Sequence, residues 1–176
     1  MKNHYEVCGD MTILYLSIKG GGFHKTLIDT SDLERVMEFV NTWYACFVKD
    51  TNSHYVRGQL TTNKKPSKIY LHRWLMNPPK NLKVDHINHD TLDNRRSNLR
   101  VCTNAENMRN ATIRSNNTSG VTGVSWVIPI SKWVARIRVN KIDIQIGCFK
   151  DFEDAVTARK RAEEQYFGEY RFMGIG

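Results

Sequence analysis

The chain has 176 residues, of which 40% are hydrophobic, and this composition favours two or three compact modules over global disorder. It contains no apolar run near the roughly 18 residues of a membrane span, and its N-terminus lacks a charged-then-apolar signal pattern. We therefore expect a soluble, cytoplasmic protein with no membrane partner.

The charge is unevenly distributed along the chain. The net charge is +8, with +1 over residues 1–65, +4 over residues 66–110 and +3 over residues 111–176. A moderate positive balance suits a nucleic-acid binder, because each neutralised phosphate releases counterions. On charge alone, a merely soluble basic protein is the alternative.

The cysteines do not form a recognisable metal or disulfide pattern. The four, none in a CxxC pair, are Cys8, Cys46, Cys102 and Cys148. This spacing in a cytosolic-looking chain disfavours a zinc site and a disulfide framework. We expect reduced, mostly buried thiols.

Residues 1–66 are expected to form an N-terminal support region, a small antiparallel sheet with one helix. The alternation of residues 11–18 and the strand-like residues 23–28 predict a hairpin, and further strands are expected at 43–47, 55–60 and 68–71. Ser31 and Glu34 have the spacing of a capping box. The helix predicted after it has an apolar stripe of Leu33, Val36, Met37 and Val40.

Residues 67–111 contain a strand, a loop, a strand and a helix in close succession. A short helix at 72–76 ends at Asn77-Pro78-Pro79. Asp85 and His86 then end a strand, residues 98–102 form the return strand, and a second capping box predicts a helix from about residue 104. A carboxylate beside an imidazole can bind a hard cation and activate water, although an isolated Asp-His pair is more often a chance neighbour or a surface hydrogen bond.

The string VDHINHDTLDNRRSNLRVCTNAENMRN resembles the HNH nuclease signature, in the variant common among phage and intron-encoded homing endonucleases. The resemblance covers about residues 71–110. It implies a ββα-metal fold, two strands and a helix that hold one divalent cation. The activity that it implies is hydrolysis of phosphodiester bonds in DNA.

The resemblance also implies roles for individual residues. His86 is expected to be the general base, and Asn98 to fix the loop and orient that base. Asp85 and Asn107 are expected to bind the cation, and their oxygen donors favour Mg²⁺ or Mn²⁺ over zinc. Many members of the wider family have His at the last position, so Asn107 leaves the identity of the cation open. Arg95 and Arg96 are candidate phosphate contacts. The alternative is that they are solvated or capping groups.

Residues 119–173 are expected to form a separate module after a polar linker at 112–118. Strand-like segments at 121–127, 133–139 and 142–149 precede a helix at 151–167. On the second strand, alternation places Trp133, Ala135, Ile137 and Val139 on one face and Val134, Arg136, Arg138 and Asn140 on the other. Three strands packed on one helix make a minimal hydrophobic core for a module of this length.

This module resembles the DNA-binding domain of plant ethylene-response factors, on Gly123-Val124, the Lys132 to Ala135 run, Ile137-Arg138, Gly147-x-Phe149 and the Glu153 to Ala155 run. In that family a three-stranded sheet enters the major groove. By position, the DNA-facing candidates here are Thr122, Ser125, Lys132, Arg136, Arg138 and Gln145. Thr122 and Ser125 replace arginines of the plant pattern and Gln145 replaces a tryptophan. A solvated strand face is the alternative for the two arginines.

The expected fold is therefore α+β throughout, and the expected function is a metal-dependent HNH-type DNA endonuclease of the homing type. The expected partner is double-stranded DNA, with no small-molecule cofactor. A DNA-binding regulator that keeps the HNH fold as a scaffold is the alternative, and a structure-specific or RNA-directed nuclease is a third hypothesis. One HNH centre cuts one strand, so a monomer would nick DNA and a homodimer could cut both strands.

Overall fold

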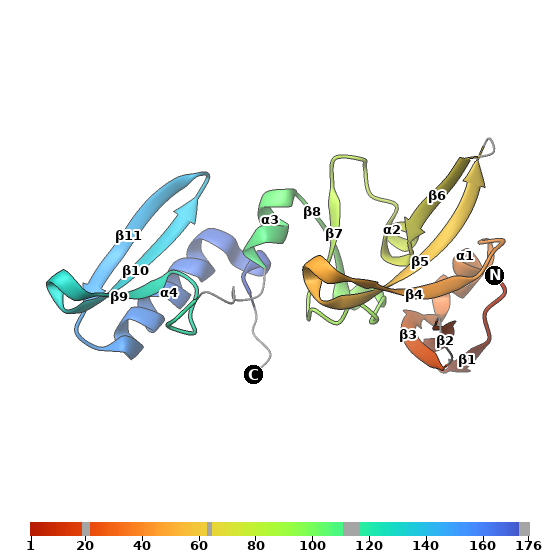
Figure 1. The fold of residues 1–176 in the computed structure, drawn as a ribbon, viewed down its shortest axis with the longest axis horizontal. Helices are drawn as coiled ribbons and strands as arrows, with labels where there is room; N and C mark the ends of the chain where they lie inside the picture. Colours follow the sequence, from red (N-terminus) through yellow and green to blue (C-terminus); the bar gives the residue numbers. More distant parts are fainter. Residues whose placement is uncertain (19–21, 63–64, 111–116, 173–176) are drawn as a thin grey trace. The chain divides into compact units, whose positions relative to one another are not determined.

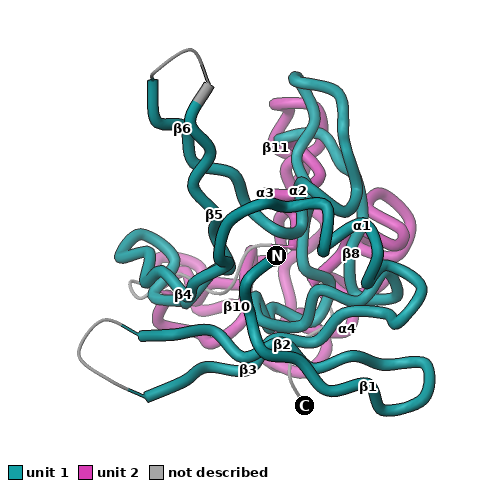
Figure 2. Tube along the Cα trace, turned by 90° about the vertical axis from the view of Figure 1, so that its right-hand side faces the viewer, with its two compact units in different colours: residues 1–104, 174–176 teal, residues 105–173 magenta. Residues whose placement is uncertain are grey.

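The computed structural model describes residues 1–18, 22–62, 65–110 and 117–172 (Figure 1). The chain divides into two compact units, which Figure 2 distinguishes by colour, the first holding residues 1–104 and the second residues 105–173. Several sheets and few helices make up the chain, so the predicted mixed α+β class is confirmed. Residues 112–116 of the expected linker lie outside the described residues.

The first unit contains a six-stranded sheet and a separate strand pair. Its strands are β1 (Tyr5–Cys8), β2 (Met11–Ser17), β3 (Phe23–Asp29), β4 (Trp43–Val48), β5 (Ser53–Thr62), β6 (Lys65–Tyr70), β7 (Lys83–His86) and β8 (Leu99–Cys102). Strands β1, β2 and β3 pair antiparallel, as do β4, β5 and β6. A single parallel pair between Ser17 and Tyr44 joins the two groups. Strands β7 and β8 pair only with each other among the described elements.

Short helical elements connect these strands. The α-helices of the first unit are α1 (Leu33–Met37) and α2 (Leu71–Met76). Single 3-10 turns occur at η1 (Thr30–Asp32), η2 (Lys49–Thr51) and η3 (Arg96–Asn98). The predicted hairpin is present as β2 and β3, with Met11 opposite Asp29 and Ser17 opposite Phe23.

The short helix predicted after residue 31 is present, but it lacks the predicted capping and ends before Val40. The turn η1 occupies Thr30–Asp32, and α1 begins at Leu33 without a side-chain cap bond at its N-terminus among the described residues. The helix ends at Met37, and Val40 is 69% exposed rather than part of a buried stripe. Asp32, at the N-cap position of α1, does not cap the helix either, because its carboxylate accepts both hydrogen bonds of the Arg96 guanidinium.

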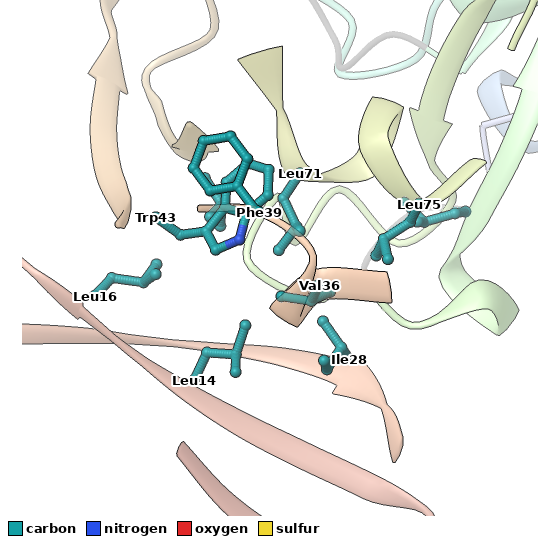
Figure 3. Packing of buried hydrophobic residues seen from close by; sticks show 10 residues of the cluster. Leu14, Leu16, Ile28, Val36, Phe39, Trp43, Leu71 and Leu75 are labelled. Atoms are coloured by element: carbon teal, nitrogen blue, oxygen red, sulfur yellow. The ribbon is translucent and has the colours of Figure 1, made fainter. Parts of the chain in front are cut away.

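One hydrophobic core unites the first unit (Figure 3). Trp43 of β4 stacks on Phe39 with ring centroids 4.1 Å apart, and Trp74 of α2 meets both rings edge-on. The core draws on β2, β3, α1, β4, β5, α2 and β8, so it includes residues of the expected support region and of the expected HNH stretch. The fully or nearly buried members are Leu14, Leu16, Ile28, Val36, Phe39, Trp43, Val56, Leu71, Leu75 and Leu99.

The second unit is a three-stranded antiparallel sheet packed on one long helix (Figure 1). Its elements are α3 (Asn104–Arg109, beginning at the last residue of the first unit), β9 (Val124–Val127), η4 (Ile128–Ile130), β10 (Lys132–Val139), β11 (Ile142–Phe149), α4 (Phe152–Phe167) and η5 (Gly168–Tyr170). Strand β10 lies in the middle, and Ala135 and Ile137 of β10 pack with Ala155 and Ala162 of α4 in two small cores. A register shift after Ala135 leaves Ile146 of β11 without a paired partner. Burial along β10 alternates from Ala135 to Arg138, whereas Val134 and Ala135 are both buried.

The cysteines are free, but the expected burial is wrong for two of them. Cys102 is buried and Cys46 half-buried, whereas Cys8 and Cys148 are exposed. Cys8 ends β1, whose residues are all exposed, and Cys148 points away from the face of β11 that α4 covers. No helix within the described residues has the length and apolarity needed to cross a membrane.

Candidate active site and nucleic-acid interface

The strand pair β7 and β8 presents Asp85 and His86. Asp85 lies opposite Arg100, and His86 lies opposite Leu99 of the core. Arg100 donates Nε and Nη2 to Oδ2 of Asp85 at 3.0 and 2.7 Å, and both side chains are largely buried. Because neighbouring residues of a strand point to opposite faces, the carboxylate and the imidazole have different surroundings.

His86 sits against two other rings of the first unit. Its centroid lies 5.1 Å from that of His72 on α2 and 6.1 Å from that of Tyr55 on β5, both edge-on. His72 in turn stacks on Tyr70 at 5.2 Å. The rings come from β5, β6 and α2, so elements outside the HNH-like strand pair fix the position of the imidazole.

The proton affinity of His86 reflects opposing influences. Burial lowers the pKa of His86 below the ordinary histidine value, while its hydrogen bond with Asn94 and the carboxylates of Asp85, Asp90 and Asp93 act in the other direction. Burial is the largest of these influences, so the ring is neutral at neutral pH. Nε2 of His86 lies 3.3 Å from Oδ1 of Asn94. A neutral, oriented imidazole is the form that can accept a proton.

His72 is held still more firmly in its neutral form. Burial, with His86 and Arg73 nearby, lowers the pKa of His72 to about 3. A histidine that stays uncharged at neutral pH does not bind phosphate as a cation. His72 therefore contributes a ring to the wall around His86 rather than a positive charge.

Asn98 organises the loop between β7 and β8. Its Nδ2 donates to the carbonyl of Asp93 at 2.8 Å, and its Oδ1 accepts from the backbone N–H of Asn88 at 2.9 Å. These bonds tie the two ends of the loop together. The structure places Asn94, rather than Asn98, in hydrogen-bond contact with His86, so any effect of Asn98 on the base is transmitted through the loop.

The same loop is docked on the N-terminal hairpin. The N–H of Leu27 on β3 donates to the carbonyl of Leu92 at 3.0 Å, and the N–H of Asn94 donates to the carbonyl of Leu27 at 2.8 Å. The Thr91 hydroxyl donates to the carbonyl of His54 on β5 at 2.6 Å. The loop thus extends the edge of β3, which explains what the support region does for the candidate site.

Arg95 and Arg96, the expected phosphate contacts of this loop, already pair with carboxylates. Arg95 donates Nε and Nη2 to Asp93 at 2.8 and 2.7 Å and lowers the pKa of that carboxyl. Arg96 donates to Asp32 in the same forked manner at 2.8 and 2.7 Å. Both arginines are thus engaged in ion pairs within the fold rather than solvated, and their DNA contact stays a prediction.

The expected cation ligands are Asp85 and Asn107. Asn107 lies on α3, near the start of the second unit, while Asp85 belongs to the first. A carboxylate oxygen and an amide oxygen are hard donors, so the donor chemistry fits Mg²⁺ or Mn²⁺. Over the described ranges, no group of three or more His, Cys, Asp or Glu side chains could hold a metal ion. That finding leaves the expected pair untested, because only Asp85 belongs to those residue types.

Five of the six expected DNA-binding residues of the second unit lie on one face of its sheet. Lys132, Arg136 and Arg138 alternate along β10, and residues paired directly across strands lie on the same face. Ser125 pairs with Val134, and Gln145 pairs with Arg136, so both join that face. Of the six candidates, Lys132 is half-buried and the others are exposed, including Thr122 just before β9.

The backbone at Arg136 is fixed from two sides. The N–H of Arg136 donates to the carbonyl of Gly123 at 2.7 Å, and the buried Arg159 of α4 donates Nη1 to the carbonyl of Arg136. Gly123 has a φ of +79°, and a Cβ there would lie 2.4 Å from the Arg136 oxygen, so glycine is required. The Arg136 side chain therefore extends from a backbone position that is held on both sides. Nε of Arg138 lies 3.7 Å from Oδ1 of Asp143, and both side chains are exposed.

Sequence reasoning missed four residues that contact or support Asp85 and His86. Asn94 lies within the Asn-rich loop, where its side chain could not be told from those of turn residues. Tyr55 and Thr26 come from strands far along the chain, and no local pattern marks them. Arg100 is part of the HNH-like string, two residues after Asn98, but only the register of β7 and β8 brings it to Asp85.

Comparison with known proteins supports the central resemblance. Residues 70–109 match the model of a family described as HNH endonuclease, which confirms the resemblance for that stretch. No curated protein matches the chain. A solved structure described as DNA binding and cleavage by the HNH homing endonuclease I-HmuI is 19% identical, covers 85% of this chain and 87% of that chain, and has a TM-score of 0.35. A score this low carries no argument, and the resemblance to ethylene-response factors stays a prediction.

Proposed function

We propose that the chain is a metal-dependent, HNH-type DNA endonuclease that hydrolyses phosphodiester bonds. The observation that carries the proposal is the placement of His86, a buried imidazole of lowered pKa that follows Asp85 at the end of a strand. Both residues lie in the stretch that matches the HNH endonuclease family. An imidazole that is neutral at working pH is suited to take a proton from water.

In the proposed reaction, His86 accepts the proton of a water molecule whose oxygen attacks the phosphorus, and the bond from phosphorus to the 3′ oxygen breaks. Asp85 and Asn107 would hold the divalent cation, which stabilises the charge on the phosphate and on the leaving oxygen when it is bound. Asn98 keeps the loop closed, and the loop carries Asn94 to His86. Arg100 holds the Asp85 carboxylate in place.

The proposed DNA-binding surface is the exposed face of the three-stranded sheet. Arg136 and Arg138 project from β10 there, and an arginine can contact phosphate or read guanine. Arg95 and Arg96 are weaker candidates, because each side chain is already paired with a carboxylate. The homing role, and an origin in a phage or an intron, rest on the sequence resemblance alone.

A DNA-binding regulator without cleavage activity is the second candidate. The observation that favours it is the Arg100 pair, because it already neutralises Asp85 at the proposed cation site. Against it, Asp85 and His86 both lie in the stretch that matches the HNH endonuclease family. The two candidates make opposite predictions about DNA integrity.

The discriminating experiment incubates supercoiled plasmid DNA with the protein and Mg²⁺ or Mn²⁺, with EDTA in parallel. The endonuclease proposal predicts nicked or linear DNA that requires the cation and is abolished by His86→Ala, while DNA binding by that variant persists. The exposed His4 provides a matched control, because His4→Ala is predicted to cleave normally. Intact plasmid across several metals and DNA sources, with retained binding, would instead establish the regulator.

A further inference from the structure

A directional chain of hydrogen bonds connects His86 to the N-terminal hairpin. The Thr26 hydroxyl of β3 lies 2.6 Å from the carbonyl oxygen of Leu92, and Nδ2 of Asn94 lies 2.9 Å from the same hydroxyl. Oδ1 of Asn94 then meets Nε2 of His86. Thr26 and Asn94 are both fully buried, so water does not substitute for these partners.

The Leu92 carbonyl at the end of this chain of hydrogen bonds determines which group donates and which accepts in each bond. A backbone carbonyl can only accept, so the 2.6 Å contact requires the Thr26 hydroxyl to donate to Leu92. That hydroxyl has a single proton and must therefore accept from the Asn94 amide, which identifies the atom facing Thr26 as nitrogen. The atom of Asn94 that faces His86 is then the oxygen, an acceptor that requires a proton on Nε2.

We propose that Thr26 and Asn94 are positioning residues that direct Nε2–H of His86 to Oδ1 of Asn94 and leave Nδ1 as the basic nitrogen. This proposal rests on the proposed function in one respect, because it takes His86 as the general base. In the reaction, Nδ1 takes the proton of the attacking water, and the ring becomes an imidazolium whose Nε2–H still donates to Asn94. The bond between phosphorus and the 3′ oxygen breaks, and the 3′ oxygen takes a proton from solvent.

This inference gives the N-terminal hairpin a second role besides docking the loop. The backbone bonds between Leu27, Leu92 and Asn94 set the position of the loop, and the Thr26 side chain sets the orientation of the Asn94 amide. Without the hydroxyl, the amide could flip and present its NH₂ group to His86. The flipped amide would favour a proton on Nδ1, the nitrogen assigned to proton transfer.

The first test needs no cleavage activity. Nitrogen-15 NMR of the full-length, metal-free protein with labelled histidine identifies which ring nitrogen of His86 carries the proton at neutral pH. Assignment uses the His86→Ala spectrum, in which the His86 signals are missing. The proposal predicts a protonated Nε2 and an unprotonated Nδ1. A proton on Nδ1, or rapid exchange between both nitrogens, would overturn it.

The second test separates positioning from stability. Thr26→Val keeps the shape of the side chain but removes the hydroxyl, and it is predicted to lower kcat for plasmid nicking by roughly 10- to 100-fold without changing KM. Thr26→Ser keeps the hydroxyl and should restore kcat to near the wild-type value. Thr12→Val is the matched control, because Thr12 is equally buried on β2 and its hydroxyl bonds to Thr30 instead.

The control should lose stability to a similar degree but keep its kcat. Equal kcat in Thr26→Val and Thr12→Val would refute the positioning role. If Thr26→Val does not fold, the NMR result on the wild-type protein still decides the tautomer. If the wild type cleaves no DNA, the proposed function fails, and the NMR result again stands or falls separately.

Discussion

Replacing Arg96 by alanine should destabilise the first unit, because the Asp32 carboxylate would lose its cation. Nε and Nη2 of Arg96 lie 2.8 and 2.7 Å from the two carboxylate oxygens, and the Asp32 side chain is 5% exposed. Removing one partner of a fully buried pair costs about 3–5 kcal/mol, and an exposed pair contributes about 0.2–1 kcal/mol. The Arg96 side chain is 50% exposed, so water reaches part of the pair. We expect a loss of about 2 kcal/mol, between these limits.

Urea unfolding would measure this loss. Trp43 and Trp74 belong to the first unit, so replacing Trp126 and Trp133 by phenylalanine makes the fluorescence specific to it. With a denaturant dependence of about 2 kcal/mol per molar urea, the midpoint should fall by about 1 M. The control is Lys68→Ala, which removes an exposed cation and should leave stability within about 0.5 kcal/mol.

A midpoint shift of Arg96→Ala no larger than that of the control would refute the reasoning. Asp32 would then be stable without its partner, and the Arg96 guanidinium would be available to a phosphate. A large shift together with unchanged DNA affinity would assign Arg96 to the fold, as the structure favours.

Three further predictions follow from the geometry. Arg136→Ala combined with Arg138→Ala should weaken DNA binding and reduce the dependence of log K on log salt by about two, one for each lost phosphate contact. Gly58→Ala should lower stability by about 1–3 kcal/mol in thermal unfolding, because its Cβ would lie 2.3 Å from the Phe39 ring. The folded pKa of His72 is about 3, against an ordinary 6.5, so the unfolded chain binds more protons between these values. The contribution of neutral His72 to the free energy of unfolding is thus fully present above pH 6.5, and it should fall by up to about 1.4 kcal/mol per pH unit towards pH 3. The substitution His72→Phe should reduce this pH dependence.

Each of these predictions has an outcome that contradicts it. For the sheet face, the control replaces the exposed Lys160 and Arg161 of α4 by alanine, and an equal change in salt slope in both double variants would place the DNA elsewhere. For Gly58, an unchanged unfolding temperature would mean that Phe39 moves aside without cost. For His72, the argument fails if the phenylalanine variant keeps the wild-type slope below pH 6.5.

The local parts of the fold could be predicted from the sequence. The hairpin of β2 and β3, the strand pair that bears Asp85 and His86, and the sheet with α4 each depend on periodicity within short segments. The alternation that places Arg136 and Arg138 on one face also survives in the structure, where burial alternates from Ala135 to Arg138. In these segments local pattern and tertiary packing favour the same structure.

Long-range contacts account for most of what could not be predicted. Asp32 is separated from Arg96 by 64 residues, and the local spacing around residue 31 does not predict their ion pair. Asn94 and Thr26 are 68 residues apart, so no local pattern relates them. Local spacing indicates candidate chemical groups, but it does not show which side chain orients the imidazole or which cation pairs with Asp85.

The most direct test of the central claim compares plasmid nicking by the wild type and by His86→Ala, with Mg²⁺, at protein concentrations that bind the same fraction of DNA. The account predicts cation-dependent nicking by the wild type and its loss in the variant, by a factor of roughly 10² or more. Undiminished nicking by His86→Ala at equal DNA occupancy would contradict the assignment of His86 as the base.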